Sequence, residues 1–264
     1  MMSFRILQIS STQNPIIQEI RRAVTGGHPL ENGLYVAEGP HLLEELLRSR
    51  WTIEKALFTP TAFSAWEDRI RQTGVETILV PEKTFAYLSG TETAQGVLAL
   101  VRPRAWRWAE LFEGCALVLA LDGVQDPGNA GAAIRSAEAF GASGATLLRD
   151  SVRISNAKLI RAAAGSLFRL PVRDAVEPEE LVREARLAGV RLYALAGDGE
   201  VCLTDLDLKI PSILIGGSEG AGVSHALLQA ATGVRISTSV VESLNVAVAC
   251  SIALFEASRQ RESR

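Results

Sequence analysis

The sequence contains few cysteines and no long hydrophobic run. Its three cysteines, Cys115, Cys202 and Cys250, are far apart and form no CxxC pair, so neither a disulfide framework nor a zinc site is indicated. Uninterrupted apolar runs such as residues 116–121 are far shorter than the ~18 residues that a membrane span needs. The N-terminus shows no apolar signal region followed by a small-residue cleavage site. We therefore expect a soluble cytoplasmic protein without membrane contact, in which the cysteines are small core residues.

Neither sign of charge predominates. The net charge of −3 at pH 7 argues against a partner held by bulk charge alone, so a nucleic acid would need a local basic patch. With 47% hydrophobic and 22% charged residues, the composition excludes a disordered, collagen-like or coiled-coil chain. The length of 264 residues suffices for one large domain or two modest ones.

The first 104 residues alternate between strand-like and helix-like segments. Strands are expected at residues 33–37, 53–58, 75–80 and 97–101, and helices after Pro40 and at residues 62–72. Strands that alternate with helices predict a layered α/β domain. We assign this domain to residues 1–104.

A short basic and aromatic segment follows. Residues 102–108 read Arg-Pro-Arg-Ala-Trp-Arg-Trp. Either the tryptophans stack on bases while the arginines contact phosphates, or the tryptophans of a linker pack on a domain. We favour the second interpretation, because mixed segments of this kind are common where domains join. Residues 105–112 are therefore assigned as a linker.

The remaining residues, 113–264, predict a second α/β domain. Residues 116–121 form a continuous apolar run of the kind that is buried on both faces of a parallel sheet. Further strand-like runs are at residues 145–148, 190–195 and 213–215, with helical stretches between them. Composition and periodicity alone predict a doubly wound parallel sheet.

Three segments of this second domain combine polar residues with glycine or alanine. The first, residues 129–135, reads Asn-Ala-Gly-Ala-Ala-Ile-Arg. We expect Asn129 to cap a helix. Arg135 lies off the apolar stripe of that helix, so it is either a solvated arginine paired with Glu138 or a functional group.

The other two segments come later in the chain. Residues 214–223 read Leu-Ile-Gly-Gly-Ser-Glu-Gly-Ala-Gly-Val. A strand that ends in glycines is where an open α/β sheet binds its ligand, and a simple turn does not explain Glu219. In residues 239–249, Ser243 or Asn245 is either a helix cap or part of a site. No strand is followed by GxGxxG and no GxxxxGKS/T occurs, which argues against a dinucleotide-dependent enzyme.

Together the three segments resemble the motifs of the SpoU (TrmH-type) RNA 2'-O-ribose methyltransferases of the SPOUT superfamily. The motifs are N-x-G-x-x-x-R in the first segment, GGSEGAGVS after a strand in the second, and ESLNVAVA in the third. The first domain resembles the substrate-binding domain that often precedes them. It has Asn14-Pro15 before a helix, Val-Ala-Glu-Gly at residues 36–39, and Thr-Ala-Gln-Gly-Val at residues 93–97. The resemblance covers almost the whole chain.

The resemblance implies a homodimeric enzyme that moves a methyl group from S-adenosylmethionine to a ribose 2'-hydroxyl of RNA. Ribosomal RNA is the favoured substrate and transfer RNA the second. A non-catalytic RNA-binding protein that keeps the fold is the alternative. The fold implied is an N-terminal α/β RNA-binding domain followed by a parallel-sheet α/β domain whose last segments form a trefoil knot, which sequence rules alone do not propose. The implied cofactor contacts are Ala196, Gly217, Ile236 and Leu244.

The family assigns activation of the hydroxyl to the arginine of the first motif, here Arg135. Because a guanidinium stays protonated in proteins, we expect Arg135 to grip an RNA phosphate and to stabilise the developing alkoxide. The resemblance adds to the catalytic set Asn129, Glu219, Ser243 and Asn245. These groups would orient the arginine and the ribose, with Glu219 as the reserve candidate for the general base. In dimers of this family the arginine and the cofactor belong to different subunits.

Two features depart from the family pattern. Ser237-Thr238 follows the isoleucine that opens the third motif, where the family usually has proline. Without the fixed φ of proline, we expect a looser cofactor loop and weaker cofactor binding. The first domain also lacks the dense Lys/Arg cluster common after its first helix, and has Arg21 and Arg22 there. We expect no metal, because His41 reads as a residue of a helix surface.

Overall fold

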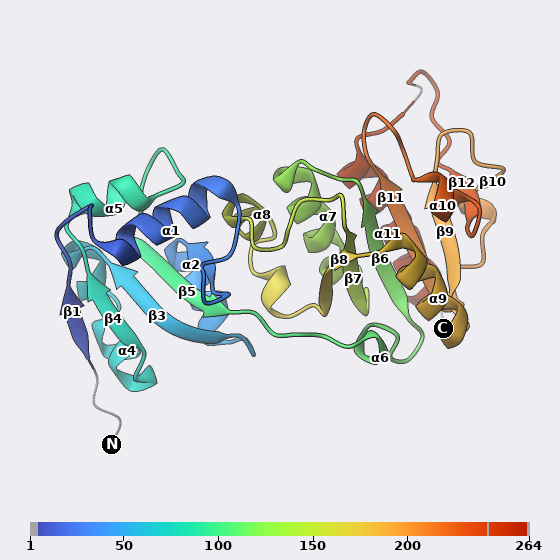
Figure 1. Ribbon diagram of the computed structural model, residues 1–264. Helices are drawn as coiled ribbons and strands as arrows, with labels where there is room; N and C mark the ends of the chain where they lie inside the picture. Colours follow the sequence, from blue (N-terminus) through green and yellow to red (C-terminus); the bar gives the residue numbers. More distant parts are fainter. Residues whose placement is uncertain (1–4, 242, 263–264) are drawn as a thin grey trace. The chain divides into compact units, whose positions relative to one another are not determined.

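The computed structural model describes residues 5–241 and 243–262, which form two compact units (Figure 1). The first unit contains the residues up to 104 together with residues 155–169, and the second contains residues 105–154 and those from 170 onward. Each unit has its own β-sheet. Within the described residues, no helix is long and apolar enough to cross a membrane.

The first unit has a five-stranded sheet of order β1-β4-β3-β5-β2. β5 is antiparallel to both of its neighbours, whereas the other pairings are parallel. The elements of this unit are β1 (Ile6–Gln8), α1 (Pro15–Gly26), β2 (Tyr35–Glu38), α2 (Pro40–Leu47), β3 (Thr52–Phe58), α3 (Pro60–Ser64), α4 (Glu67–Thr73), β4 (Glu76–Leu79), α5 (Glu82–Leu88), β5 (Val97–Arg102) and α8 (Ala157–Ala162). The layered α/β domain predicted from the alternation of segments is confirmed.

Proline and capping side chains fix where helices of this unit begin. Asn14 caps α1, because its Oδ1 accepts a hydrogen bond from the backbone N–H of Ile16 at 3.1 Å. Proline occupies the first turn of α1, α2 and α3, where its missing N–H costs nothing. α1 and α5 turn their apolar stripes toward one face of the sheet. The single helix expected at residues 62–72 is wrong, since the chain turns after α3 and buries Trp66 before α4 begins.

A segment from the second half of the sequence completes the first unit. We call residues 155–169 the inserted segment. Ser155 Oγ donates a hydrogen bond to the carbonyl oxygen of Gly27 at 2.9 Å, and the ring of Phe168 lies 5.2 Å from that of Trp51, edge to face. The sequence alone assigns this segment to the second α/β domain, because nothing in its pattern shows which sheet its apolar side chains cover.

The inserted segment also supplies the partner of a buried carboxylate. The side chain of Glu38 is only 2% exposed, and Arg161 donates Nη1 to its Oε2 at 3.3 Å. Gly90 donates its N–H to the same oxygen at 2.9 Å, while the hydroxyls of Ser89 and Thr91 donate to Oε1. A buried charge needs such a set of partners. The fold of the first unit therefore depends on a residue far along the sequence.

The second unit has a seven-stranded sheet of order β10-β12-β9-β11-β6-β7-β8, and every pairing in it is parallel. Its elements are α6 (Trp108–Leu111), β6 (Leu117–Asp122), α7 (Pro127–Ala139), β7 (Gly144–Leu148), β8 (Val172–Val176), α9 (Pro178–Ala188), β9 (Arg191–Leu195), β10 (Val201–Cys202), β11 (Ser212–Gly217), α10 (His225–Leu228), β12 (Thr232–Arg235) and α11 (Val246–Glu262). The predicted parallel sheet is confirmed. Periodicity missed β8, β10 and β12, which are short and partly exposed.

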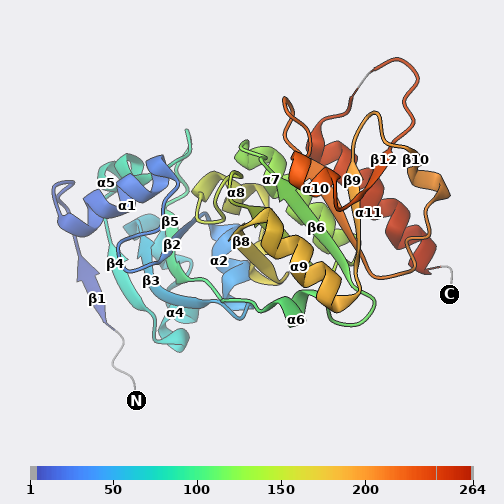
Figure 2. The ribbon, with the colours of Figure 1, turned by 45° about the vertical axis from the view of Figure 1, so that its right-hand side comes forward.

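Helices cover both faces of this sheet (Figure 2). α9 and α10 lie in front of the strands in that view, and Leu181 and Leu227 contribute to the core between them and the sheet. On the other face α7 packs against α11, with Ser136 Oγ and Ser251 Oγ 2.7 Å apart. β6 is buried along its whole length, as a strand covered on both faces must be.

The tryptophans of the basic and aromatic segment are structural. Trp106 is part of the core of the second unit. Trp108 donates its Nε1–H to Glu180 Oε1 at 2.8 Å, and the guanidinium of Arg173 lies 4.6 Å from the centre of its ring. The preferred interpretation, in which these rings pack on a domain, is confirmed.

The buried carboxylate leads to a stability prediction. We expect Arg161→Ala to lower the free energy of unfolding by about 1–3 kcal/mol, because Glu38 then stays buried without its cationic partner. Urea unfolding followed by circular dichroism measures this loss. The control is Arg48→Ala, whose exposed pair with Glu44 should contribute less than about 1 kcal/mol. Equal losses in the two variants would contradict this account.

Candidate functional site

Loops that follow three parallel strands meet at one edge of the second sheet, where open parallel sheets bind their ligands. The loops after β9, β11 and β12 and the start of α11 line a pocket of about 520 Å³, which we call the main pocket. It is lined by the predicted cofactor residues Ala196, Gly217, Ile236 and Leu244 and by the predicted catalytic residues Glu219, Ser243 and Asn245. The structure thus brings together seven of the nine residues selected from the sequence.

Gly217 allows the loop after β11 to fold back closely. A Cβ atom at this position would lie 2.1 Å from the carbonyl carbon of Gly222 and 2.2 Å from the nitrogen of Val223. Ser218 and Gly222 exchange two backbone hydrogen bonds of 3.1 and 2.9 Å, and Gly222 has φ of 68°, a conformation that favours glycine. The wall of the main pocket is therefore backbone, and a side chain at Gly217 would displace it.

Three predicted catalytic residues form one hydrogen-bonded cluster, which we call the Asn-Glu-Asn cluster. Asn129 Nδ2 donates to Glu219 Oε1 at 2.8 Å. Asn245 Nδ2 donates to the same oxygen at 2.9 Å and to Asn129 Oδ1 at 3.1 Å. Among the described residues, Glu219 Oε2 has no hydrogen-bond partner. The two amides hold the carboxylate in place and leave one oxygen free.

The way in which α7 and α11 are capped leaves the amides of Asn129 and Asn245 able to bind Glu219. Asp126, and not Asn129 as predicted, caps α7: its Oδ1 accepts a hydrogen bond from the N–H of Asn129 at 2.7 Å. Because Pro127 opens the helix, the cap lies before it and the side chain of Asn129 is free to reach Glu219. Asn245 has both functions, since its Oδ1 accepts from the N–H of Ala247 at 3.0 Å while its amide nitrogen joins the cluster.

Arg135 projects from α7 and is exposed. No hydrogen bond or ion pair engages its guanidinium within the part of the chain that the structure describes, so the pairing with Glu138 is not formed. Arg135 lines neither the main pocket nor the adjoining pocket of about 350 Å³, which Asn129 and Glu219 line. Its guanidinium is therefore free to bind an external anion.

Ser237, which stands where the family usually has proline, makes a side-chain contact. Its Oγ lies 3.4 Å from Sγ of Cys202 on β10. Hydrogen bonds from Ser237 and then from Thr204 lower the pKa of the Cys202 thiol to about 7. The loop is thus tethered by a side chain, and the weaker cofactor binding expected without proline stays a prediction. Glu242, in the same loop, lies outside the described residues.

The expectation that all three cysteines are core residues holds for one of them. Cys250 is buried in α11 beside Gly216, and burial raises its pKa to about 12. Cys115 is exposed and Cys202 is half-buried, so the expectation is wrong for both. Cys115 comes just before β6 and Cys202 ends an edge strand, where neighbouring elements do not enclose them.

Two further carboxylates, neither of them predicted from the sequence, lie at this edge of the sheet. Asp122 ends β6, is buried, and accepts a hydrogen bond from the N–H of Ser224 at 2.6 Å, which anchors the loop after β11. Asp198 follows β9 and lines the main pocket. The available signal for Asp122 was its position at the end of a continuous apolar run, the usual place for ligand-binding residues, whereas Asp198 follows β9 by three residues and carries no such signal.

The main pocket suits an amphipathic cation with an apolar ring. Glycines, alanines and aliphatic side chains make most of its lining, and hydroxyls, one amide and two carboxylates complete it. These groups fit S-adenosylmethionine, which combines an adenine ring, hydroxyls and a sulfonium. Among the described residues no three His, Cys, Asp or Glu side chains form a candidate metal site, and His41 is exposed on α2.

The close approach at Gly217 leads to a binding prediction. We expect Gly217→Ala to weaken the binding of S-adenosylmethionine about tenfold or more, because the new methyl group must push the pocket wall away. Isothermal titration calorimetry measures the effect. Gly220→Ala is the matched control in the same loop, since a Cβ atom there meets nothing within 4 Å. Equal dissociation constants for the two variants would show that this wall does not contact the cofactor.

Comparisons with known proteins agree with this geometry. Residues 116–255 match the SpoU rRNA Methylase family, and residues 14–99 match the MRM3-like substrate binding domain. The chain is 33% identical to an uncharacterized tRNA/rRNA methyltransferase of Synechocystis, over 97% of this chain and 95% of that protein. It is 32% identical to the 23S rRNA (guanosine(2553)-2'-O)-methyltransferase RlmP of Bacillus subtilis, over 94% of this chain and 98% of that protein.

Solved structures give the same result. A crystal structure of an AdoMet-bound rRNA methyltransferase from Sinorhizobium meliloti has a TM-score of 0.86 and 30% identity, and the match covers 96% of this chain and 98% of that one. The SpoU methyltransferase AviRb from Streptomyces viridochromogenes has a TM-score of 0.83 and 25% identity, over 95% of this chain and 98% of that one. The parallel sheet, the three motifs at one edge of it and these matches lead to one conclusion: the chain belongs to the SpoU rRNA methylase family.

Proposed function

We propose that the chain uses S-adenosylmethionine to methylate a ribose 2'-hydroxyl of ribosomal RNA. The Asn-Glu-Asn cluster carries the proposal, because it places an oriented carboxylate between the main pocket and the adjoining one. The family match and the 23S rRNA methyltransferase of Bacillus subtilis favour ribosomal over transfer RNA. Such a substrate agrees with a cytoplasmic location.

The residues at the site have separate roles in this proposal. Backbone and side-chain groups of Ala196, Gly217, Ile236 and Leu244 hold the cofactor, which supplies an electrophilic methyl group when bound. The free Oε2 of Glu219 is placed to accept the proton of the attacking hydroxyl. Arg135 stays protonated, binds an RNA phosphate and stabilises the developing alkoxide. Ser243 and the two amides orient the ribose and the carboxylate.

The first unit has the role of the RNA-binding domain in this proposal. Its match to a substrate binding domain supports that role. We extend the proposal to the trefoil knot of the family. The loops after β9, β11 and β12 all line one pocket, as they would if the last segments of the chain were threaded there.

A homodimer is also part of the proposal. Residues 246–255 of α11 are almost all apolar: one side of this half is buried, yet Val248, Ile252 and Phe255 on another are 48%, 37% and 53% exposed. An exposed apolar stripe of this kind is normally covered by a partner, and a second copy of the chain is the partner that the family implies. In such a dimer Arg135 of one subunit serves the cofactor of the other.

The function is tested by transfer of labelled methyl groups to unmodified ribosomal and transfer RNA, with the products analysed as nucleosides. We expect a 2'-O-methylnucleoside in ribosomal RNA, and a loss of rate of about 100-fold or more in Arg135→Ala with unchanged cofactor affinity. The matched control is Arg186→Ala, an exposed arginine on α9, which should keep full activity.

Two other outcomes of this test are informative. Full activity of Arg135→Ala would remove that residue from the mechanism. RNA binding without affinity for S-adenosylmethionine would favour the non-catalytic alternative and contradict the proposed enzyme.

The dimer is tested by Phe255→Glu, which places a charge on the exposed apolar face of α11. We expect a monomer by size-exclusion chromatography with light scattering, and loss of methyl transfer. Leu187→Glu is the control, because Leu187 is 76% exposed on α9 and away from this face. A dimeric Phe255→Glu variant would show that the subunits associate elsewhere.

A further inference from the structure

The main pocket has a lining of one charge sign. Of the described residues that line it, only Asp198 and Glu219 are charged, and none is basic. A site with these carboxylates attracts a cation and gains nothing from a neutral ligand of the same shape. The negative lining therefore favours a cationic ligand over a neutral one.

The two carboxylates are not equivalent. Glu219 Oε1 accepts hydrogen bonds from Asn129 and Asn245, which compensate part of its charge. Asp198 is exposed to the pocket, and no hydrogen bond or ion pair within the described residues engages its side chain. Its full negative charge is therefore available to a ligand.

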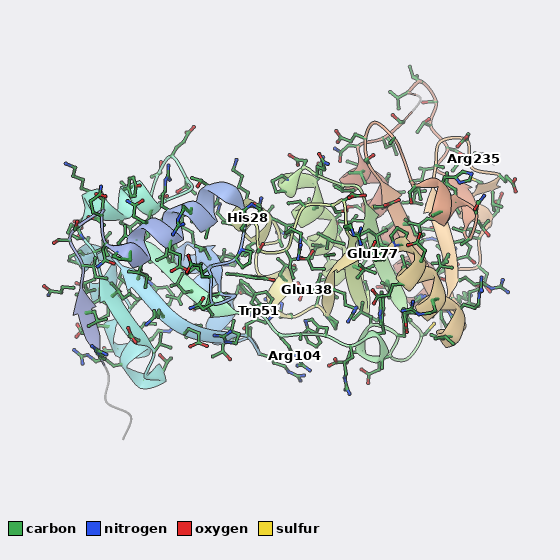
Figure 3. The ribbon with its side chains drawn as sticks, in the orientation of Figure 1. His28, Trp51, Arg104, Glu138, Glu177 and Arg235 are labelled. Atoms are coloured by element: carbon green, nitrogen blue, oxygen red, sulfur yellow. The ribbon has the colours of Figure 1, made fainter. Side chains whose placement is uncertain are left out.

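The turn that carries Asp198 is held rigidly. Arg235, labelled in Figure 3, donates Nη1 to the carbonyl oxygens of Gly199 at 3.0 Å and Glu200 at 2.7 Å. A Cβ atom at Gly199 would lie 2.5 Å from the carbonyl carbon of Val234, so this turn packs directly on β12. The backbone that carries Asp198 is thus held in place by Arg235 and β12. The guanidinium of Arg235 donates to these carbonyl oxygens and does not pair with Asp198.

We propose that Asp198 makes the main pocket select the cationic cofactor over its neutral product. The inference rests on the proposed function. S-Adenosylmethionine differs from S-adenosylhomocysteine by one methyl group and by the positive charge of the sulfonium. Methyl transfer converts the sulfonium into a thioether, and the pocket then loses the charge that Asp198 attracts. Asp198 is a specificity residue that strengthens the binding of S-adenosylmethionine, so that fresh cofactor displaces the product more readily after each transfer.

The test measures the dissociation constants of S-adenosylmethionine and S-adenosylhomocysteine by calorimetry for the wild type, Asp198→Asn and Glu200→Gln. We expect Asp198→Asn to lower the preference for S-adenosylmethionine about three- to tenfold, the range expected for one charge pair near solvent. The affinity for S-adenosylhomocysteine should change less than twofold. Glu200→Gln removes the same charge two residues away, on a side chain that does not line the pocket, and should change neither constant.

Two results would overturn the inference. An unchanged ratio of the two dissociation constants in Asp198→Asn, even if both ligands bind more weakly, would mean that Asp198 does not distinguish their charge. If Glu200→Gln changed the ratio of the two dissociation constants as much as Asp198→Asn does, the effect would come from the net charge of the protein and not from a carboxylate in the pocket. Wild-type protein that binds neither ligand would instead contradict the proposed function. A thermal unfolding midpoint matched to that of the wild type shows that the asparagine variant is folded.

Discussion

The parallel pairing of β9, β11 and β12 is the constraint on which the site depends. Parallel strands all end at the same edge, so three loops that are distant in sequence must share a small space there. They fit because two turns have no side chain at their points of closest approach, Gly217 against the loop after β11 and Gly199 against β12. Close packing of backbone on backbone gives a pocket whose walls cannot adjust freely.

The polar groups at this edge of the sheet are held in place by contacts at the N-termini of α7 and α11. Asp126 and Asn245 cap the two helices that start at the same edge. Their caps place Asn129 and Asn245 against Glu219, so the two helix starts and the loop after β11 together position this carboxylate. The exposed guanidinium of Arg135 is the exception, since the described structure leaves it unengaged. In the proposed mechanism its partners are an RNA phosphate and the cofactor site of a second subunit.

Much of this could be predicted from the sequence, for physical reasons that differ by region. β6 and β11 are buried strands with continuous apolar runs. Each of the three motifs taken alone has an ordinary structural explanation, but their order and spacing together match one family. The family, the α/β fold and the cofactor class are confirmed by the matches. Short strands such as β10 and β12 carry too little periodicity to be seen.

Other features could not be predicted because they depend on long-range contacts. Nothing local shows that residues 155–169 belong with the first unit, where Arg161 neutralises a buried Glu38. The cap of α7 is a local feature instead, since Pro127 in the first turn marks the preceding Asp126 as the cap. Asp198 carries no motif, and its proposed role rests on the pocket that it lines.

Ribose methylation of ribosomal RNA by this protein can be tested directly in the cell. Ribosomal RNA from cells with and without the gene is digested, and its 2'-O-methylated nucleotides are mapped by mass spectrometry. We expect the loss of one such nucleotide in cells without the gene, which the wild-type gene restores and the Arg135→Ala gene does not. An unchanged set of ribose methylations in ribosomal RNA, with a change in transfer RNA or in neither, would contradict it.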